Sequence, residues 1–278
     1  MKNILKIMLM MITIFTIAGS AVYAAEIPVS DQDQLITSND WTEISNLQDE
    51  MKKEEPDATI DYDKALKVYV DCNLIKLQTA DTKKLTSALE SANYVWVIPF
   101  KMEKTYGMFT VAKGLPLREE AKSVLTKAEQ EEVKNHAGKW MITEIAEHTV
   151  EPYYDILLEK REALSDCTRV VLVGSQPGMR QPVALGMDDE TARIWISLGY
   201  QYPVMEKIPE TQNVESGVYS FDSVAEISDT YIEDSEVSTG SGVQSRSSMK
   251  YVAGIGIIVI GSILILSVLK KKKLEDYE

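Results

Sequence analysis

Two histidines and two cysteines are the residues of this chain best suited to nucleophilic or acid–base chemistry. Cys72 or Cys167 could form a nucleophile–base pair with His136 or His148, because a thiol nucleophile needs a nearby base to activate it. Each also has an ordinary structural interpretation: His136, just before Gly138, suits the end of a helix, and Cys72 falls on the inward face of a strand. We therefore expect no catalytic constellation and no enzymatic activity.

Motifs that hold metals, nucleotides or phosphates are absent from the sequence. It contains no His-Glu-x-x-His, no Gly-x-Ser-x-Gly, no Gly-x-Gly-x-x-Gly and no Asp-x-Asp-x-Asp-Gly calcium loop. Paired carboxylates for hydrolysis remain an alternative, but acidic residues are so numerous that they carry little information. We expect no cofactor and no metal.

Aromatic side chains are the remaining candidates for recognition. Trp195 with Arg193 and Tyr200 would form a recognition patch if one face of their strand is exposed, because aromatic residues and arginine dominate interface hot spots. Core packing is the alternative for Trp195, and it is also the ordinary interpretation of Trp96 and Trp140.

The elements that position these residues alternate between helices and strands. In the first half, hydrophobic periodicity predicts helices over 41–53 and 81–92, and strands over 66–72, 94–100 and 106–112. Asp40 is expected to cap the first helix, with Glu43 three residues further on.

The second half repeats this mixture, with predicted helices over 126–138 and 151–163 and predicted strands over 169–174, 183–187 and 193–198. Thr126 and Glu129 form a capping box for the first of these helices. Residues 140–148 fit a strand or a helix equally well. The order of elements predicts an α+β fold, a mostly antiparallel sheet with helices packed on one face.

The N-terminal apolar run predicts export. Lys2 and Lys6 precede the uncharged residues 7–18, and small residues lead to Ala24. This is the layout of a secretory signal peptide, here residues 1–24 with cleavage after Ala24. An uncleaved membrane anchor is the alternative.

The C-terminal apolar run predicts a transmembrane helix over residues 250–269. At about 1.5 Å per residue, a run of this length matches the hydrocarbon thickness of a bilayer. Four lysines follow it and would stop its transfer: Lys270, Lys271, Lys272 and Lys273. We therefore expect a single-pass protein of the cell membrane, with its N-terminus outside and a cytoplasmic tail over residues 270–278.

A leader, a terminal apolar run and a basic tail together resemble the layout of Gram-positive proteins that sortase attaches to the cell wall. That family has Leu-Pro-x-Thr-Gly just before the apolar run. Residues 236–240 of this chain, Glu-Val-Ser-Thr-Gly, keep only the final two residues of that motif. We therefore expect retention in the membrane rather than attachment to the wall.

Between the two apolar runs the chain is strongly acidic. The whole chain has a net charge of −14, and the lysines gathered near its two ends leave the middle more negative still. Such a surface repels nucleic acid. Residues 25–205 suffice for one domain, whereas residues 206–249 are rich in acidic residues and poor in apolar ones, which predicts a flexible stalk.

The two cysteines both fall in the part of the chain that is expected to be exported. An even number of cysteines there permits one disulfide, between Cys72 and Cys167. Two buried free thiols are an equal alternative, because cysteine is among the most buried residue types.

These features together predict a membrane-anchored bacterial cell-surface protein whose extracytoplasmic domain is a binding, accessory or scaffold module. Its expected partners are the membrane, through the C-terminal helix, and an envelope protein or polymer, with no role for nucleic acid. The alternative function is that of a membrane-tethered envelope hydrolase that uses carboxylates.

Overall fold

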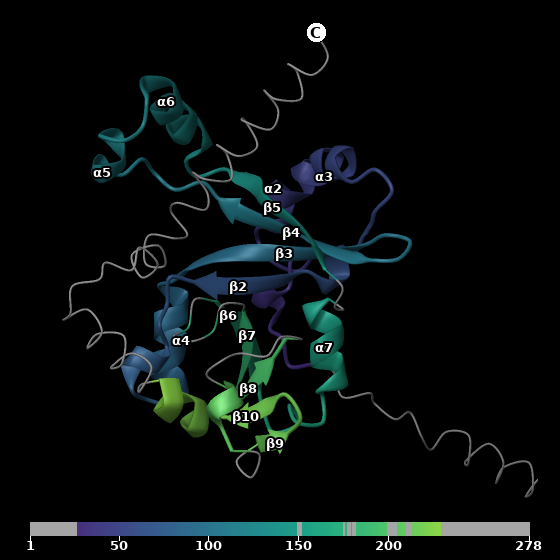
Figure 1. Cartoon of the computed structure of the whole chain (residues 1–278), viewed down its shortest axis with the longest axis vertical. Coiled ribbons are helices and arrows are strands. Elements are labelled where there is room, and N and C mark those ends of the chain that lie inside the picture. The colour runs from purple at the N-terminus through teal and green to yellow at the C-terminus, as the bar shows by residue number, and fades with distance from the viewer. Residues whose placement is uncertain are drawn as a thin grey trace, which may run out of the picture.

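The computed structural model describes residues 27–148, 152–174, 176, 179, 182–198, 205–209 and 213–228 (Figure 1). Several predicted features lie outside these residues. They are the signal peptide with its cleavage site at Ala24, Tyr200, the end of the predicted stalk, the membrane helix 250–269 and the tail. Within the described part of the chain, no helix is long and apolar enough to cross a membrane.

One large sheet organises the described residues. Its strands are β1 (Thr59–Ile60), β2 (Leu66–Val70), β3 (Asn93–Lys101), β4 (Tyr106–Lys113), β5 (Trp140–His148), β6 (Arg169–Val173), β7 (Val183–Met187), β8 (Ala192–Ser197), β9 (Asn213–Glu215) and β10 (Val218–Ser220). Their order is β5-β4-β3-β2-β6-β7-β8-β10-β9, with β1 also paired to β3. Among the strand pairs of the described residues, only β2 and β6 run parallel. The predicted α+β fold with a mostly antiparallel sheet is confirmed.

Helices cover both faces of this sheet, so the prediction of helices on one face is wrong. Val68 of β2 points toward α7 (Tyr153–Glu159), and Tyr69 points toward α4 (Thr82–Glu90) on the other side. The physical reason is that β2, β6 and β7 are buried on both faces, so each face must be covered by other elements.

Three apolar clusters result from this arrangement. The α7 cluster, around Leu157, lies on one face of the sheet. The opposite face carries the α4 cluster, around Leu85 and Trp195, and the α3 cluster, around Met51 and Trp96. The α3 cluster is covered by α2 (Trp41–Ile44), a 3-10 turn over Ser45–Leu47, and α3 (Gln48–Glu54).

The predicted helix starts at Asp81 and Thr126 are confirmed. The Asp81 carboxylate accepts a hydrogen bond from the backbone N–H of Lys84 at 3.1 Å and begins α4. Thr126 and Glu129 form the reciprocal capping box of α6 (Lys127–His136), which follows the short helix α5 (Glu119–Lys122). Both caps act within one helical turn, so residues close together in the sequence determine these helix starts.

The structure decides one open prediction and corrects another. Residues 140–148, which the sequence left undecided, form strand β5. The predicted stalk over residues 206–249 is wrong in its first part, because β9 and β10 extend the sheet and residues 221–228 are helical. Phe221 and Val224 are buried in the α4 cluster, so these sparse apolar side chains suffice to hold an acidic segment on the domain.

Candidate functional site

The sheet has a seam between β2 and β6. These two strands pair at only two positions, Val68 with Leu172 and Tyr69 with Val173. The seam is otherwise filled by residues 27–35, which we call the latch segment. Backbone hydrogen bonds and one isolated bridge join this segment to both strands or the residues beside them.

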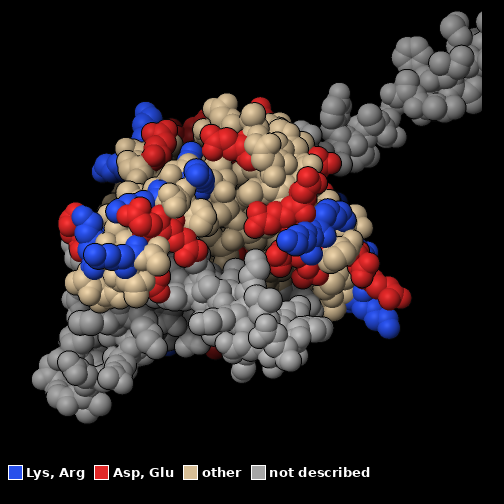
Figure 2. Space-filling model, turned by 90° about the horizontal axis from the view of Figure 1, so that it is seen from above, with Lys and Arg blue, Asp and Glu red and all other residues tan. Residues whose placement is uncertain are grey.

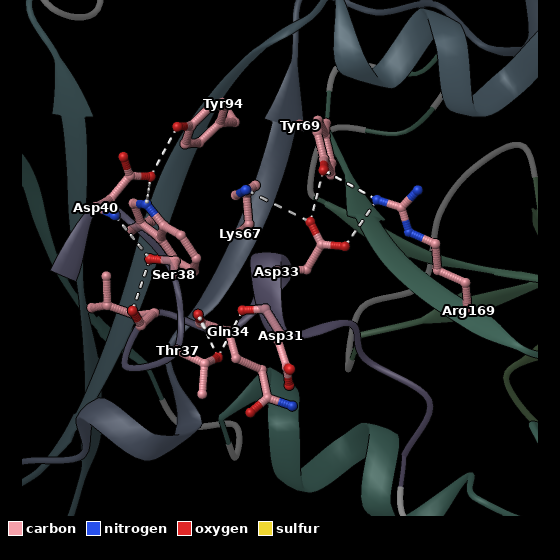
Figure 3. A network of polar contacts seen from close by, with 12 residues as sticks. Asp31, Asp33, Gln34, Thr37, Ser38, Asp40, Lys67, Tyr69, Tyr94 and Arg169 are labelled. Atoms are coloured by element: carbon pink, nitrogen blue, oxygen red, sulfur yellow. Dashed lines mark hydrogen bonds and ion pairs between the residues drawn. The ribbon is translucent and has the colours of Figure 1, made fainter.

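A buried carboxylate of the latch segment lies at the centre of a charged cluster (Figure 3). Asp33 is 2% exposed and accepts hydrogen bonds from the Tyr69 hydroxyl at 2.7 Å and from Nη2 of Arg169 at 2.9 Å. Nζ of Lys67 lies 3.8 Å from Oδ1 of the same carboxylate. Because Lys67 and Tyr69 come from β2 and Arg169 comes from β6, this one carboxylate connects the two strands across the seam.

Lys67 lies among aromatic rings as well as beside Asp33. Its Nζ is 4.5 Å from the ring centroid of Tyr94 and 5.2 Å from that of Trp96, distances at which a cation is attracted to the face of a ring. Burial lowers the pKa of Lys67, and the nearby carboxylate of Asp33 opposes that shift. The cluster therefore holds a desolvated ammonium group beside one carboxylate and the faces of two aromatic rings.

Asp40 has a different role from the predicted helix cap. Its side chain makes no capping hydrogen bond to α2. Its Oδ2 instead accepts hydrogen bonds from the Tyr94 hydroxyl at 2.8 Å and from Nε1 of Trp96 at 3.0 Å (Figure 3). The carboxylate thereby connects the start of α2 to β3, and burial together with this hydrogen bond raises the pKa of Tyr94.

This arrangement is suited to holding strands together. A general acid or base needs a substrate within hydrogen-bond reach. The Asp33 carboxylate is instead enclosed by the Arg169 and Lys67 cations and by the Tyr69 hydroxyl, which donates a hydrogen bond to it. The tyrosine hydroxyl is held protonated, since burial and the Asp33 hydrogen bond raise the pKa of Tyr69. Sequence reasoning missed this cluster because the partners of Asp33 are distant in the sequence. They lie between 34 and 136 positions further along the chain.

The two cysteines are free buried thiols, and the disulfide alternative is wrong. Cys72 belongs to the α4 cluster and Cys167 to the α7 cluster, so the sheet separates their side chains. Burial raises the pKa of each thiol to about 11. A reactive cysteine needs a depressed pKa, so neither thiol suits a nucleophile. His136 ends α6 and His148 ends β5, on elements that carry neither cysteine.

The predicted recognition patch does not form as expected. Trp195 is fully buried and stacks on Phe221 with ring centroids 5.5 Å apart. Arg193 is exposed and pairs with Asp188 at 3.4 Å. The two side chains differ in burial because the helix over 221–228 covers Trp195, and Tyr200 lies outside the described residues. Trp96 and Trp140 are buried in the α3 cluster, which confirms core packing for them.

A shallow pocket lies between residues 75–80 and the helix over 221–228. Its volume is about 220 Å³, and its lining is largely apolar, with Asp222 as the single carboxylate among the described residues that line it. A hydrolase that works through carboxylates needs two of them facing one bond. Among the described residues, no group of three or more histidine, cysteine or acidic side chains could hold a metal ion.

The outer edge of β5 is the main unpaired feature of the sheet. β5 has β4 on one side and, among the described residues, no strand on the other. The register with β4 shifts beside Thr143, whose hydroxyl donates to the Thr110 carbonyl at 3.1 Å. Glu144 follows this irregularity and is exposed. A bulge of this kind re-aims side chains along an edge.

Figure 2 shows one face of the molecule, on which acidic and basic side chains lie next to one another. Comparisons with protein families, with characterised proteins and with solved structures found no match to this chain.

Proposed function

We propose that this chain is a membrane-anchored bacterial cell-surface protein whose extracytoplasmic domain is a binding or accessory module, and that the outer edge of β5 is its docking surface. The observation that carries the proposal is the contrast between the two edges of the sheet. Among the described residues, β5 has nine residues, whereas β9 at the other edge has three. The signal peptide and the membrane helix come from the sequence alone.

A long edge strand presents a row of backbone donors and acceptors. Proteins usually protect such edges by keeping them short or covering them, because an added strand pairs there readily. At about 3.4 Å per residue, β5 spans roughly 30 Å, and the bulge at Thr143 divides its outer edge. An extended peptide that pairs with this edge gains main-chain hydrogen bonds, and the neighbouring side chains provide specificity.

Charge indicates which occupant fits this edge. In antiparallel pairing of β5 with a second copy about the middle of the strand, two copies of Glu144 would approach each other, and like charges placed opposite each other destabilise a strand pair. A lysine or arginine opposite Glu144 stabilises it instead. The net charge of −14 also attracts a basic partner during the encounter. The occupant is therefore an extended, basic segment of another envelope protein.

The test compares charge reversals at two exposed sites of the full-length protein, purified in detergent. Glu144→Lys places the wrong charge on β5, and the control Glu132→Lys makes the same change on α6. Each variant is immobilised, and bound envelope proteins are identified by mass spectrometry. We expect one protein with a basic, extended segment to bind the wild type and the control, and to bind Glu144→Lys at least about tenfold less, equal to 1.4 kcal/mol. Equal binding to both variants would refute the docking surface.

A further inference from the structure

The pocket between residues 75–80 and the helix over 221–228 shares no residue with the Asp33 cluster or with β5. In Figure 1 the first of these segments leads into α4, and the second is the yellow-green helix beside α4. The lining includes Ile75, Gln78 and Ala80 from the first segment and Phe221, Asp222 and Ala225 from the second. The pocket therefore forms only when the folded domain brings these distant segments together.

Strand β8 holds both walls of this pocket in place. On one wall, the Ala80 carbonyl accepts a hydrogen bond from the backbone N–H of Ala192, the first residue of β8, at 2.6 Å. On the other wall, the Phe221 ring stacks on Trp195 of the same strand, with ring centroids 5.5 Å apart. Because both walls are attached to one strand, their separation is fixed by the domain itself. The pocket is therefore formed before a ligand arrives, as most binding pockets are.

The size and the lining of the pocket together define what it can take. Its volume of about 220 Å³ lies below the roughly 300–1,000 Å³ of sites for whole small molecules, so it suits a single side chain. Its walls are largely apolar, and its one described carboxylate, Asp222, is exposed. Among the described residues, Asp222 forms no ion pair. Lysine and arginine side chains lay their apolar stems on such surfaces while the charged end stays in water.

We propose that this pocket binds the side chain of a lysine or arginine of a partner polypeptide. The apolar stem of that side chain lies against Phe221 and Ala225, and its charged end pairs with Asp222. The net charge of −14 attracts a basic segment to this surface. The proposal does not depend on the docking surface on β5, because β8 lies toward the opposite edge of the sheet.

The backbone of Gln78 supports a binding role for the segment ahead of α4. Gln78 follows the 3-10 turn over Ile75–Leu77 and has a φ of 48°, in the left-handed region. Glycine usually occupies such a position, because it has no Cβ and adopts this conformation without strain. Strained backbone of this kind gathers at ligand sites. Glutamine keeps the strain and adds to the lining of the pocket a side chain that glycine lacks.

The test titrates the full-length protein, purified in detergent, with three short peptides. Each peptide is blocked at both ends and has glycine on either side of a central lysine, arginine or norleucine, which has an apolar stem like that of lysine but no charge. Binding is followed by NMR through the methyl groups of Ala80 and Ala225, which line the pocket. We expect the lysine and arginine peptides to shift both signals with a Kd in about the millimolar range. The norleucine peptide should bind at least about threefold more weakly, because it lacks the ion pair.

Three variants separate the pocket from the general charge of the protein. Asp222→Asn should weaken binding of the lysine and arginine peptides at least about threefold and leave the norleucine peptide unchanged. Glu226→Gln removes the same charge at an exposed residue one turn further along the helix, and it should change no Kd. Ala225→Leu places a larger side chain in the pocket and should weaken all three peptides, as followed at Ala80. Three results would each overturn the proposal: no saturable shift with lysine or arginine, equal binding of norleucine, or equal effects of Asp222→Asn and Glu226→Gln.

Discussion

Removal of the Asp33 carboxylate should destabilise the domain more than any other change at an acidic side chain of the described residues. Asp33→Ala leaves Lys67 and Arg169 without their counter-charge and the Tyr69 hydroxyl without its acceptor. Breaking a buried ion pair from one side costs about 3–5 kcal/mol. The Arg169 side chain is 17% exposed and retains some water, so we expect a value near the lower end, about 3 kcal/mol.

Urea unfolding followed by tryptophan fluorescence measures this loss, since Trp96 lies beside the charged cluster. For a domain of this size, about 3 kcal/mol corresponds to a fall in Tm of roughly 6–12 °C. Asp31→Ala is the matched control, because Asp31 lies in the same short turn and is exposed. It should change the free energy of unfolding by less than about 0.5 kcal/mol.

A second substitution tests the assigned cause. Adding Lys67→Met to Asp33→Ala removes one of the two unpaired cations while keeping most of the side-chain volume. We expect the double variant to regain about 1–2 kcal/mol, because a buried charge without a partner is replaced by an apolar chain. If Asp33→Ala and Asp31→Ala unfold at the same urea concentration, the Asp33 cluster does not hold β2 to β6 and the reasoning fails.

Three further outcomes follow from the core and the buried ionisable groups. Gly107→Ala should lower the free energy of unfolding by about 1–3 kcal/mol, because its new Cβ would lie 2.0 Å from the Phe100 ring; unchanged urea unfolding would contradict this. Cys72 and Cys167 should resist a thiol reagent at pH 8 in the native protein and both react in urea without a reductant, since burial raises both pKa values to about 11; a mass matching a disulfide would contradict it. The raised pKa of Tyr69 means that the folded state retains a proton that the unfolded state loses near pH 10, so stability should fall above that pH, and less so in Tyr69→Phe, as pH-dependent unfolding would show.

The sequence predicts those parts of the fold that depend on neighbouring residues. The capping residues Asp81 and Thr126 act on backbone groups three positions away, so their helices could be predicted. The carboxylate of Asp40 also precedes a helix, but its partners on β3 lie 54 and 56 positions further along the chain. No local pattern shows that these distant donors compete for it.

Burial by distant segments explains the other differences. In the sequence, Trp195 fits an exposed position as well as a buried one. In the structure, Phe221 stacks on its ring and helps to bury it. The acidic residues around Phe221 and Val224 indicate a flexible segment, but both side chains pack beside Trp195 of β8 in the α4 cluster. Strand β5 has apolar residues that fit either periodicity, and its pairing with β4 decides the outcome.

The measurement that tests the central claim most directly is site-specific photocrosslinking in intact cells. A photoreactive residue is placed at position 144 on β5 or at position 132 on α6 of the full-length chain, and crosslinked peptides are sequenced. The account predicts that position 144 crosslinks to an extended, basic segment of one envelope protein and that position 132 does not. Equal crosslinking from both positions, or crosslinks from position 144 only to a second copy of this chain, would contradict it.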